Sequence, residues 1–264
     1  MKITIFTSNQ SRHNYLINKI SEISDEIFVI QENKNIILSK TNVATVSNIK
    51  KDYFSKVEKA QNLIFNAHSA IINKSKNKIL QINMGELSSM PFNIMKDYLK
   101  SDLYIVFGSS YIKDKLIDFL IGRDTINIHM GVSPYYRGTA CNFWALHDNN
   151  PHLVGATIHK LTKGLDDGPI IYHAISEQVE DYFIYTMSTV KSAILSLCQI
   201  IQKKKLDKFI VTDQVKTKQI RYTRHIDFND KAIINFKKIK IEKKAIDFKI
   251  LKDYFLLKKE DFFL

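Results

Sequence analysis

Apolar runs alternate with amphipathic stretches over the first half of the chain. The runs at 2–7 and 26–32 predict strands, and 102–110 contains a continuous apolar run, as in an interior strand of a parallel sheet that is covered on both faces. Residues 12–20 and 111–120 carry apolar side chains at helical spacing. This alternation predicts an α/β fold, Rossmann-like, with a mostly parallel sheet flanked by helices.

The same pattern continues toward the C-terminus with further elements. Strands are expected at 125–129, 153–161 and 169–175, and helices at 140–148 and 181–205. Residues 33–100 are less regular, because 61–75 fits a helix or a strand and 84–92 indicates a loop. After 205 the chain has short mixed elements without glycine or proline, which predicts a small C-terminal extension.

A polar pair interrupts the strand expected at 125–129. Asn127 and His129 are two positions apart and so share one face, while Ile128 faces the packed layer on the other side. The pair stands at the carboxyl end of a predicted parallel strand, which is the edge where open α/β sheets bind ligands. Asn127 and His129 are therefore candidates for a functional site, with a purely structural histidine as the alternative.

Turn-forming residues are concentrated just after this strand. Glycine lets the backbone adopt left-handed conformations and approach a ligand closely. Five of the eight glycines and three of the four prolines lie in this region: Gly131, Gly138, Gly155, Gly164, Gly168, Pro134, Pro151 and Pro169. Candidate site residues are therefore sought here.

Two adjacent carboxylates, Asp166 and Asp167, lie in the turn between the strands at 153–161 and 169–175. Such a pair is also common in plain surface turns. Combined with Asn127 and His129, it suggests a carboxylate that orients an imidazole, an imidazole that moves a proton and an amide that hydrogen-bonds an oxyanion. No serine or cysteine is evidently placed as a nucleophile, which favours direct acyl transfer between two substrates.

The stretches "INIHMGVSPYYRGTACNFWAL" and "GATIHKLTKGLDDGPII" resemble the formyltransferases that use 10-formyltetrahydrofolate. The shared motifs are Asn-x-His at 127–129, Pro-x-x-Arg-Gly at 134–138 and Leu-Asp-x-Gly at 165–168. "YIVFGSSYIK" is similar to the family's strand that leads into the folate-side loop. The resemblance is strong over 102–174, weaker over 1–32, and implies the formyltransferase fold.

The resemblance also implies a mechanism. An acceptor amine attacks the formyl carbon, Asn127 donates to the oxyanion, and His129 takes a proton from the amine or donates toward the oxyanion, while Asp166 holds His129. The co-substrate 10-formyltetrahydrofolate is expected and a metal is not. The implied folate-binding residues are Gly108, Ser109, Ser110, Tyr111, Ile112 and Leu165.

The group most similar to this chain formylates amino sugars linked to nucleoside diphosphates, for cell-surface polysaccharide such as the O-antigen of lipopolysaccharide. Its members have a short C-terminal part that often mediates dimerisation, so a nucleotide-linked amino sugar and a homodimer are expected. The candidate acceptor-binding residues are Ser8, Ser11, Arg12, Arg137, Gly138 and His159. Ser11 is alternatively a helix N-cap, and His159 a core or surface residue.

Other acceptors stay open. Members that formylate methionyl-tRNA carry a C-terminal β-barrel, and residues 186–264 look too short and too helical for one. Members that formylate glycinamide ribonucleotide have a glycine-rich loop after the first strand, whereas this chain has "SNQSRH". A different class is a non-catalytic, basic nucleic-acid-binding protein on the same scaffold. The retained catalytic residues, and aromatic residues spaced for packing, argue against it.

Charge adds one observation. The net charge is +12, and residues 201–264 carry 18 Lys and Arg against 9 Asp and Glu. A basic segment suggests an anionic partner, or simply a solvated lysine-rich surface. We expect a catalytic core at 1–185 and a basic extension at 186–264 that serves dimerisation or acceptor binding.

Composition bounds the class of protein. A hydrophobic content of 45% and a charged content of 25% are typical of a globular domain. No apolar run approaches the roughly 20 residues that a membrane helix needs, and the N-terminus is unlike a signal peptide. Cys141 and Cys198 are expected to be reduced thiols, so a cytoplasmic protein with no membrane partner is predicted.

Overall fold

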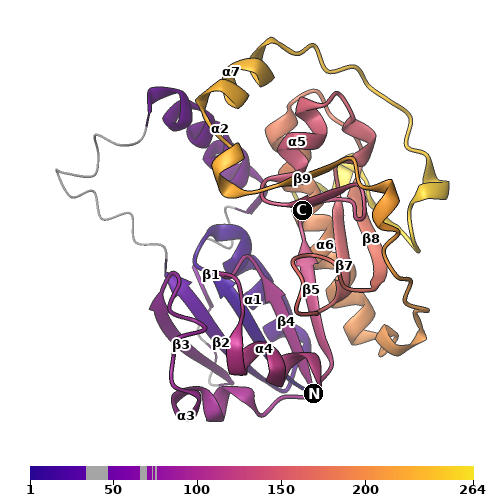
Figure 1. The fold of residues 1–264 in the computed structure, drawn as a ribbon. Coiled ribbons are helices and arrows are strands. Elements are labelled where there is room, and N and C mark those ends of the chain that lie inside the picture. Colours follow the sequence, from indigo (N-terminus) through magenta and orange to yellow (C-terminus); the bar gives the residue numbers. More distant parts are fainter. Residues whose placement is uncertain (34–46, 66–69, 73, 75) are drawn as a thin grey trace.

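The computed structural model describes residues 1–33, 47–65, 70–72, 74 and 76–264. The strands are β1 Lys2–Ser8, β2 Glu26–Asn33, β3 Asn77–Asn83, β4 Leu103–Phe107, β5 Thr125–His129, β6 Tyr136–Gly138, β7 Ala156–Lys160, β8 Ile170–Ser176, β9 Arg221–Thr223 and β10 Phe255–Leu257. The helices are α1 Ser11–Ile23, α2 Asn48–Phe65, α3 Phe92–Met95, α4 Asp114–Ile121, α5 Cys141–His147, α6 Tyr182–Gln202 and α7 Asp230–Lys238. These elements are arranged as an α/β fold (Figure 1).

One mixed sheet runs through the described part of the chain, in the order β10-β8-β7-β5-β4-β1-β2-β3. The neighbours from β3 to β5 are all parallel, whereas β7 is antiparallel to both β5 and β8. The expected mostly parallel sheet flanked by helices is therefore confirmed. The reversal at β7 brings its residues directly opposite those of β5.

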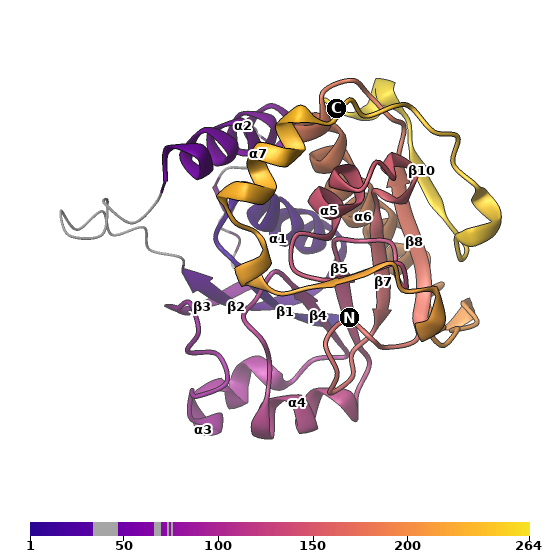
Figure 2. The same cartoon turned by 45° about the horizontal axis from the view of Figure 1, so that its top comes forward.

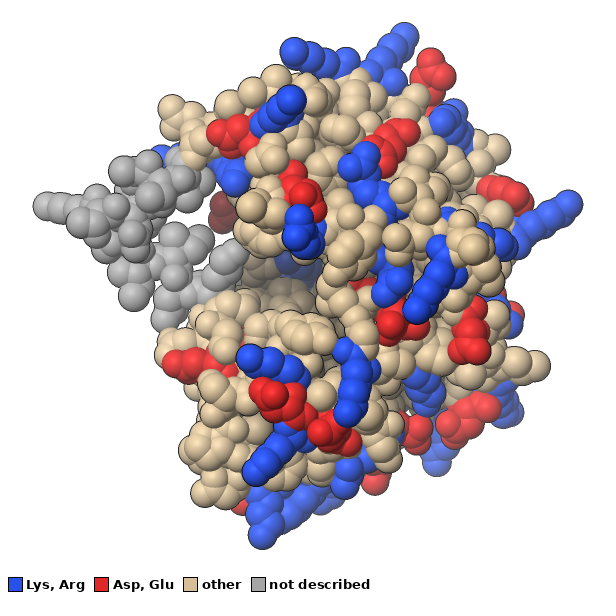
Figure 3. Space-filling view, in the orientation of Figure 1, with Lys and Arg blue, Asp and Glu red and all other residues tan. Residues whose placement is uncertain are grey.

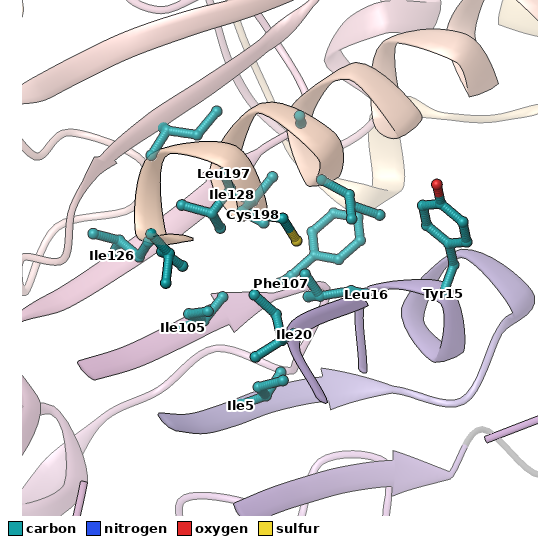
Figure 4. Packing of buried hydrophobic residues seen from close by; sticks show 14 of the residues in the cluster. Ile5, Tyr15, Leu16, Ile20, Ile105, Phe107, Ile126, Ile128, Leu197 and Cys198 are labelled. Atoms are coloured by element: carbon teal, nitrogen blue, oxygen red, sulfur yellow. The ribbon is translucent and has the colours of Figure 1, made fainter. Parts of the chain in front are cut away.

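Helices cover both faces of the sheet (Figure 2). On one face, α1 and α6 pack on a core that includes Ile5, Ile105, Ile126 and Ile128. Figure 4 shows Ile126 and Ile128 beneath α6, close to Leu197. Burying each such aliphatic side chain contributes about 1.5–3 kcal/mol. This packing holds every second residue of β5 and leaves the alternate residues to face the other side.

The C-terminal segment is built into the same molecule. Helix α6 spans the expected boundary at residue 185, and β10 pairs with β8 in the main sheet. Helix α7 packs on α2 and α5 through an aromatic group in which Tyr53 lies next to Phe143, Phe228 and Phe236. The functional division into core and extension stays a prediction.

Several basic residues of this segment pair with acids elsewhere in the fold. Lys237 contacts Asp52 at 2.7 Å and Lys258 contacts Glu177 at 3.0 Å. On the face seen in Figure 3, Lys and Arg side chains lie interspersed with Asp and Glu. This arrangement favours the interpretation of these lysines as a solvated surface.

Four local expectations need correction. Helix α4 begins at Asp114, because residues 111–113 belong to the loop after β4. Strand β7 begins at Ala156, after a 3₁₀ turn at Pro151–Leu153. Ser11 is the first residue of α1 rather than its N-cap, which is Gln10. Helix α6 is long and apolar enough to cross a membrane, contrary to the expectation, but most of it is buried inside the fold.

The ambiguous stretch 61–75 is partly resolved. Residues up to Phe65 end α2, so its first part is helical. Residues 66–69, 73 and 75 lie outside the described part of the chain. The expected loop at 84–92 is present up to residue 91, since these residues form turns and Phe92 begins α3.

Candidate active site

The polar pair of β5 lies where the strand pattern places it. Ile126 and Ile128 are in the core, so Asn127 and His129 face the opposite side of the sheet, toward a cleft of about 490 Å³. Asp166, from the β7–β8 loop, lines the same cleft. The structure thus brings together all three residues to which the resemblance assigns catalysis.

His129 lies between two hydrogen-bond acceptors. Its Nδ1 is 3.3 Å from Oδ2 of Asp166, and its Nε2 is 3.1 Å from the carbonyl oxygen of Tyr136. A ring that faces acceptors at both nitrogens donates from both, and this requires the imidazolium form. The side chain of His129 is 5% exposed and that of Asp166 is 12% exposed, so the pair is shielded from water.

The attraction between the two groups raises the pKa of His129 and lowers that of Asp166. Burial opposes the charge on His129, but Asp166, with a smaller contribution from Cys141, raises the pKa of His129 well above 6.5. Burial likewise opposes the charge on Asp166, yet His129 and the backbone N–H of Gly138 lower its pKa to about 2. The site therefore holds a charged pair at neutral pH.

The side chain of Asn127 forms a hydrogen bond with a second histidine, His159. In the β5–β7 register Asn127 lies opposite His159, and its Nδ2 is 3.0 Å from Nε2 of that ring. The His159 Nδ1 donates to the carbonyl of Lys160 at 2.8 Å, so Nε2 is left as an acceptor. Burial lowers the pKa of His159 to about 4, which keeps the ring neutral. His159 thus contacts Asn127 and also lines the cleft.

Both N–H groups of Asn127 have acceptors within the protein. One donates to His159 and the other to Oδ1 of Asp166, at 3.2 Å. These two acceptors fix which way the amide faces. Donation from Asn127 to an oxyanion therefore requires one of these hydrogen bonds to be shared or exchanged.

The turn after β5 is held against β7. The hydroxyl of Thr157 donates to the carbonyl of Gly131 at 2.6 Å and accepts from the N–H of Ser133 at 2.8 Å. A Cβ at Gly131 would lie 2.7 Å from Nε2 of His129 and 2.6 Å from Cβ of Cys141. Any larger residue at this position would therefore require these side chains to shift, so glycine here leaves the imidazole undisturbed.

The loop after β4 forms another wall. The six residues implied in folate binding all line the cleft: Gly108, Ser109, Ser110, Tyr111, Ile112 and Leu165. The Tyr111 hydroxyl donates to the carbonyl of Lys163 at 2.7 Å, which joins this loop to the β7–β8 loop. The two loops expected to hold the folate therefore lie on either side of one cleft.

At the start of α1, a cationic side chain lines the cleft without an acidic partner. Among the described residues, the hydrogen-bond partner of the Arg12 guanidinium is Oε1 of Gln61, at 2.5 Å, and no carboxylate pairs with it. Burial lowers the pKa of Arg12 to about 10. The buried Nδ1 of the adjacent His13 also has no partner in the described part of the chain. This end of the cleft is suited to an anion.

The remaining candidate residues are placed differently. Gly138 lines the cleft, whereas Ser8, Ser11 and Arg137 are not among the lining residues in the described chain. Arg137 donates to the carbonyl of Leu165 at 2.7 Å and lies 3.9 Å from Asp167. It thereby braces the loop that carries Asp166.

Sequence reasoning missed two contributors. His13 lines the cleft, but nothing in the pattern of α1 marks it apart from the adjacent Arg12. Glu32 is fully buried and accepts hydrogen bonds from Ser110 in the loop after β4. Glu32 could have been found from the sequence, because it is a carboxylate near the end of an apolar strand. In the residues that the structure describes, no group of three metal-ligating side chains occurs.

Comparison with known proteins agrees with this geometry. The sequence model of the formyl transferase family matches residues 29–193, which include β5 and the β7–β8 loop. The chain belongs to the formyl transferase family. The match contains Asn127, His129 and Asp166, so the clustered residues lie within the part of the chain that defines the family.

Curated members of the family match over part of their length. A methionyl-tRNA formyltransferase of Thermodesulfovibrio yellowstonii is 32% identical over 136 residues, which are 51% of this chain and 44% of that protein. One from Thermosipho africanus is 35% identical over 112 residues, 42% of this chain and 34% of that protein. The chain thus matches less than half the length of these relatives.

Solved formyltransferases share the fold. A 4-N formyltransferase from Francisella tularensis has a TM-score of 0.51 at 20% identity and covers 92% of this chain and 82% of that one. An N-formyltransferase from Helicobacter canadensis, solved with folinic acid and dTDP-3-aminofucose, has a TM-score of 0.51 at 15% identity, covering 95% and 78%. A phosphoribosylglycinamide formyltransferase from Anaplasma phagocytophilum also has a TM-score of 0.51 at 15% identity, covering 85% and 98%.

Proposed function

We propose that this protein is an N-formyltransferase that moves the formyl group of 10-formyltetrahydrofolate to the primary amine of a nucleoside-diphosphate-linked amino sugar. The observation that carries the proposal is the charged His129–Asp166 pair beside Asn127, at the carboxyl end of β5 in a cleft of about 490 Å³. The formyl-transfer step follows from this cluster. The sugar nucleotide follows from the other end of the cleft.

In the transfer, the neutral amine of the acceptor attacks the formyl carbon. Negative charge then develops on the formyl oxygen, and the His129 imidazolium and the Asn127 amide stabilise it. The His129 pKa above its ordinary value makes this ring a proton donor rather than the first base. The acceptor nitrogen is positively charged after the attack and gives up one proton. Collapse of the intermediate then breaks the bond between the formyl carbon and the folate nitrogen, which takes up one proton and leaves as an amine.

Arg12 indicates which kind of acceptor the cleft binds, because among the described residues this cation has no acidic partner. A half-buried guanidinium without a carboxylate partner is costly, and a phosphate group supplies the missing anion. It stands in the first turn of α1, where backbone N–H groups also favour anions. A nucleoside diphosphate carries such groups, so a sugar linked to one fits this end of the cleft while its amine reaches the cluster. Polysaccharide precursors are compounds of this kind, and the product would enter cell-surface polysaccharide.

The direct test is incubation of the protein with 10-formyltetrahydrofolate and a panel of nucleotide-linked amino sugars, with products detected by mass spectrometry. We expect one sugar nucleotide to gain a formyl group. Formylation of charged initiator tRNA, with no product from any sugar, would overturn the acceptor assignment.

Arg12 provides a sharper check of the acceptor. Arg12→Gln should raise the KM for the sugar nucleotide on the order of 10-fold or more, since a charge-assisted contact to phosphate is lost. The KM for the folate should stay unchanged. The control is Arg123→Gln, because Arg123 stacks on Phe119 away from the cleft. An equal rise in both KM values would contradict a phosphate role.

Methionyl-tRNA is the second candidate acceptor, because the curated relatives with 32–39% identity carry that name. The observations that favour the sugar are local. Among the described residues, Arg12 lines the cleft without a carboxylate partner, and the buried Nδ1 of the adjacent His13 has no hydrogen-bond partner. A homodimer remains a proposal, to be checked by light scattering on the purified protein.

A further inference from the structure

A buried carboxylate outside the catalytic cluster stands behind the folate-side loop. Glu32 is near the carboxyl end of β2, and it is 0% exposed. Among the described residues it forms no salt bridge, so no cation offsets its charge. Burying an unpaired carboxylate is costly unless several donors surround it, and this residue therefore calls for an explanation.

The donors around Glu32 come from two separate loops. Its Oε1 accepts from the backbone N–H of Gly85 at 2.8 Å and from the hydroxyl of Ser110 at 2.6 Å. Its Oε2 accepts from the backbone N–H of Ser110. One side chain thus joins the turn after β3 to the loop after β4. Such charge-assisted hydrogen bonds are about twice as strong as neutral ones.

This arrangement changes the part that Ser110 can play. Both of its donor groups point at Glu32, so neither is left to bind a ligand in the cleft. Instead Ser110 fixes the path of its neighbours Ser109 and Tyr111, which line the cleft. The far side of the same loop is held by the Tyr111 hydroxyl on the carbonyl of Lys163.

We propose that Glu32 is a positioning residue that holds the Gly108–Ile112 loop, through Ser110, in the conformation that receives the folate. It touches neither substrate and acts through the backbone of that loop. The inference rests on the proposed function, because it takes this loop as the folate-binding wall. The carboxylate of Glu32 thereby controls the affinity for the folate and leaves the affinity for the acceptor unaffected.

The chemistry requires a carboxylate at this position. Two oxygens accept three hydrogen bonds here, and both N–H donors come from the backbone, which cannot rotate away. In Glu32→Gln, an amide N–H replaces one oxygen and faces a donor at either loop. Either orientation of the amide therefore loosens Gly85 or Ser110, and the variant cannot reproduce the original arrangement.

The test measures folate binding without any acceptor. Binding of tetrahydrofolate to wild type, Glu32→Gln and Ser110→Ala is followed by titration calorimetry, and folding is checked by circular dichroism. We expect Kd to rise on the order of 10-fold for Glu32→Gln and by less for Ser110→Ala, which keeps the backbone donor. The control is Glu26→Gln, since Glu26 lies at the opposite end of β2 and pairs with Lys2 and Lys78 on the surface.

A kinetic readout separates positioning from general destabilisation. Glu32→Gln should raise the KM for the formyl donor, with kcat within a few-fold and the KM for the acceptor unchanged. Unchanged tetrahydrofolate affinity in a folded Glu32→Gln variant, or an equal rise of both KM values, would overturn the inference. If Glu32→Gln does not fold, Ser110→Ala decides alone, and an unchanged Kd in that variant has the same meaning. Failure of wild type to bind tetrahydrofolate would instead refute the proposed function.

Discussion

At the residue scale, the candidate site is a closed hydrogen-bond network with one charged pair. Asn127 donates to His159 and Asp166, and His129 donates to Asp166 and to the Tyr136 carbonyl. Each donor has an acceptor, so burial is tolerated without bound substrate. The two histidines differ in charge state, because Asp166 outweighs the effect of burial at His129, whereas burial lowers the pKa of His159 and keeps that ring neutral.

The protonation of His129 is the first prediction at this scale. In Asp166→Asn the carboxylate is lost while burial remains, so the pKa of His129 should fall below 6.5. Wild type should keep an imidazolium at pH 7, and the variant should not, as checked by NMR titration of the histidine rings. Asp167→Asn is the matched control, because Asp167 contacts Thr162 and Arg137 rather than His129.

The same substitution has a consequence for rate. A group that acts as a proton donor loses activity as pH rises through its pKa, so the alkaline limb of kcat lies above pH 6.5 in wild type. In Asp166→Asn this limb should move to lower pH, and kcat at neutral pH should fall on the order of 100-fold. An unshifted limb with near-normal kcat would show that the charged pair is not part of the transfer.

At the element scale, the turns after β5 and β7 decide which residues meet. The short strand β6 pairs with β9, and at this contact Gly138 adopts a φ of +91°. A Cβ there would lie 2.0 Å from the carbonyl oxygen of Thr223. The N–H of the same glycine supports Asp166, so a backbone requirement and a site requirement coincide at one residue.

Replacement of Gly138 tests this close approach. Gly138→Ala combines an unfavourable φ with a backbone clash and should lower the free energy of unfolding by about 1–3 kcal/mol. Gly85→Ala is a matched control, since Gly85 has a φ of +94° with nothing within 4 Å of its Cβ. Denaturant unfolding measures both. Equal losses in the two variants would mean that strain, and not contact with β9, accounts for the effect.

At the scale of the whole molecule, the C-terminal segment is part of one folded unit. It adds β10 to the sheet edge and places α7 on α2 and α5, so segments far apart in the chain share one core. Phe236 of α7 is 7% exposed and lies 5.0 Å from Phe143, centroid to centroid. This packing argues for a single cooperative transition, although the segment looks like an extension in the sequence.

Cooperativity is tested through Phe236. Phe236→Ala should lower the free energy of unfolding by about 3 kcal/mol, because a buried aromatic side chain is removed. The loss should appear in one transition seen alike by far-UV circular dichroism and by fluorescence of the single tryptophan. Ile226→Ala is the control, since that side chain is 73% exposed. Two separated transitions would show that the segment folds independently of the core.

Periodicity in the sequence was sufficient to predict β1, β2, β4, β5, β7 and β8, the helices α1, α4, α5 and α6, and the face on which Asn127 and His129 lie, because it reports burial directly. It did not predict α2 and β3, which lie in the irregular stretch 33–100, or the short strands β6, β9 and β10. The family resemblance pointed to Asp166 and implied a folate-binding role for the loop after β4, which stays a prediction. Tertiary structure alone decided the partners: His159 on Asn127, Glu32 behind Ser110, and Arg12 without an acid. These contacts join residues far apart in the chain, and their strength depends on burial and on which donors remain free. Local pattern contains neither quantity, so charge state and the positions of loops appear only once the sheet is assembled.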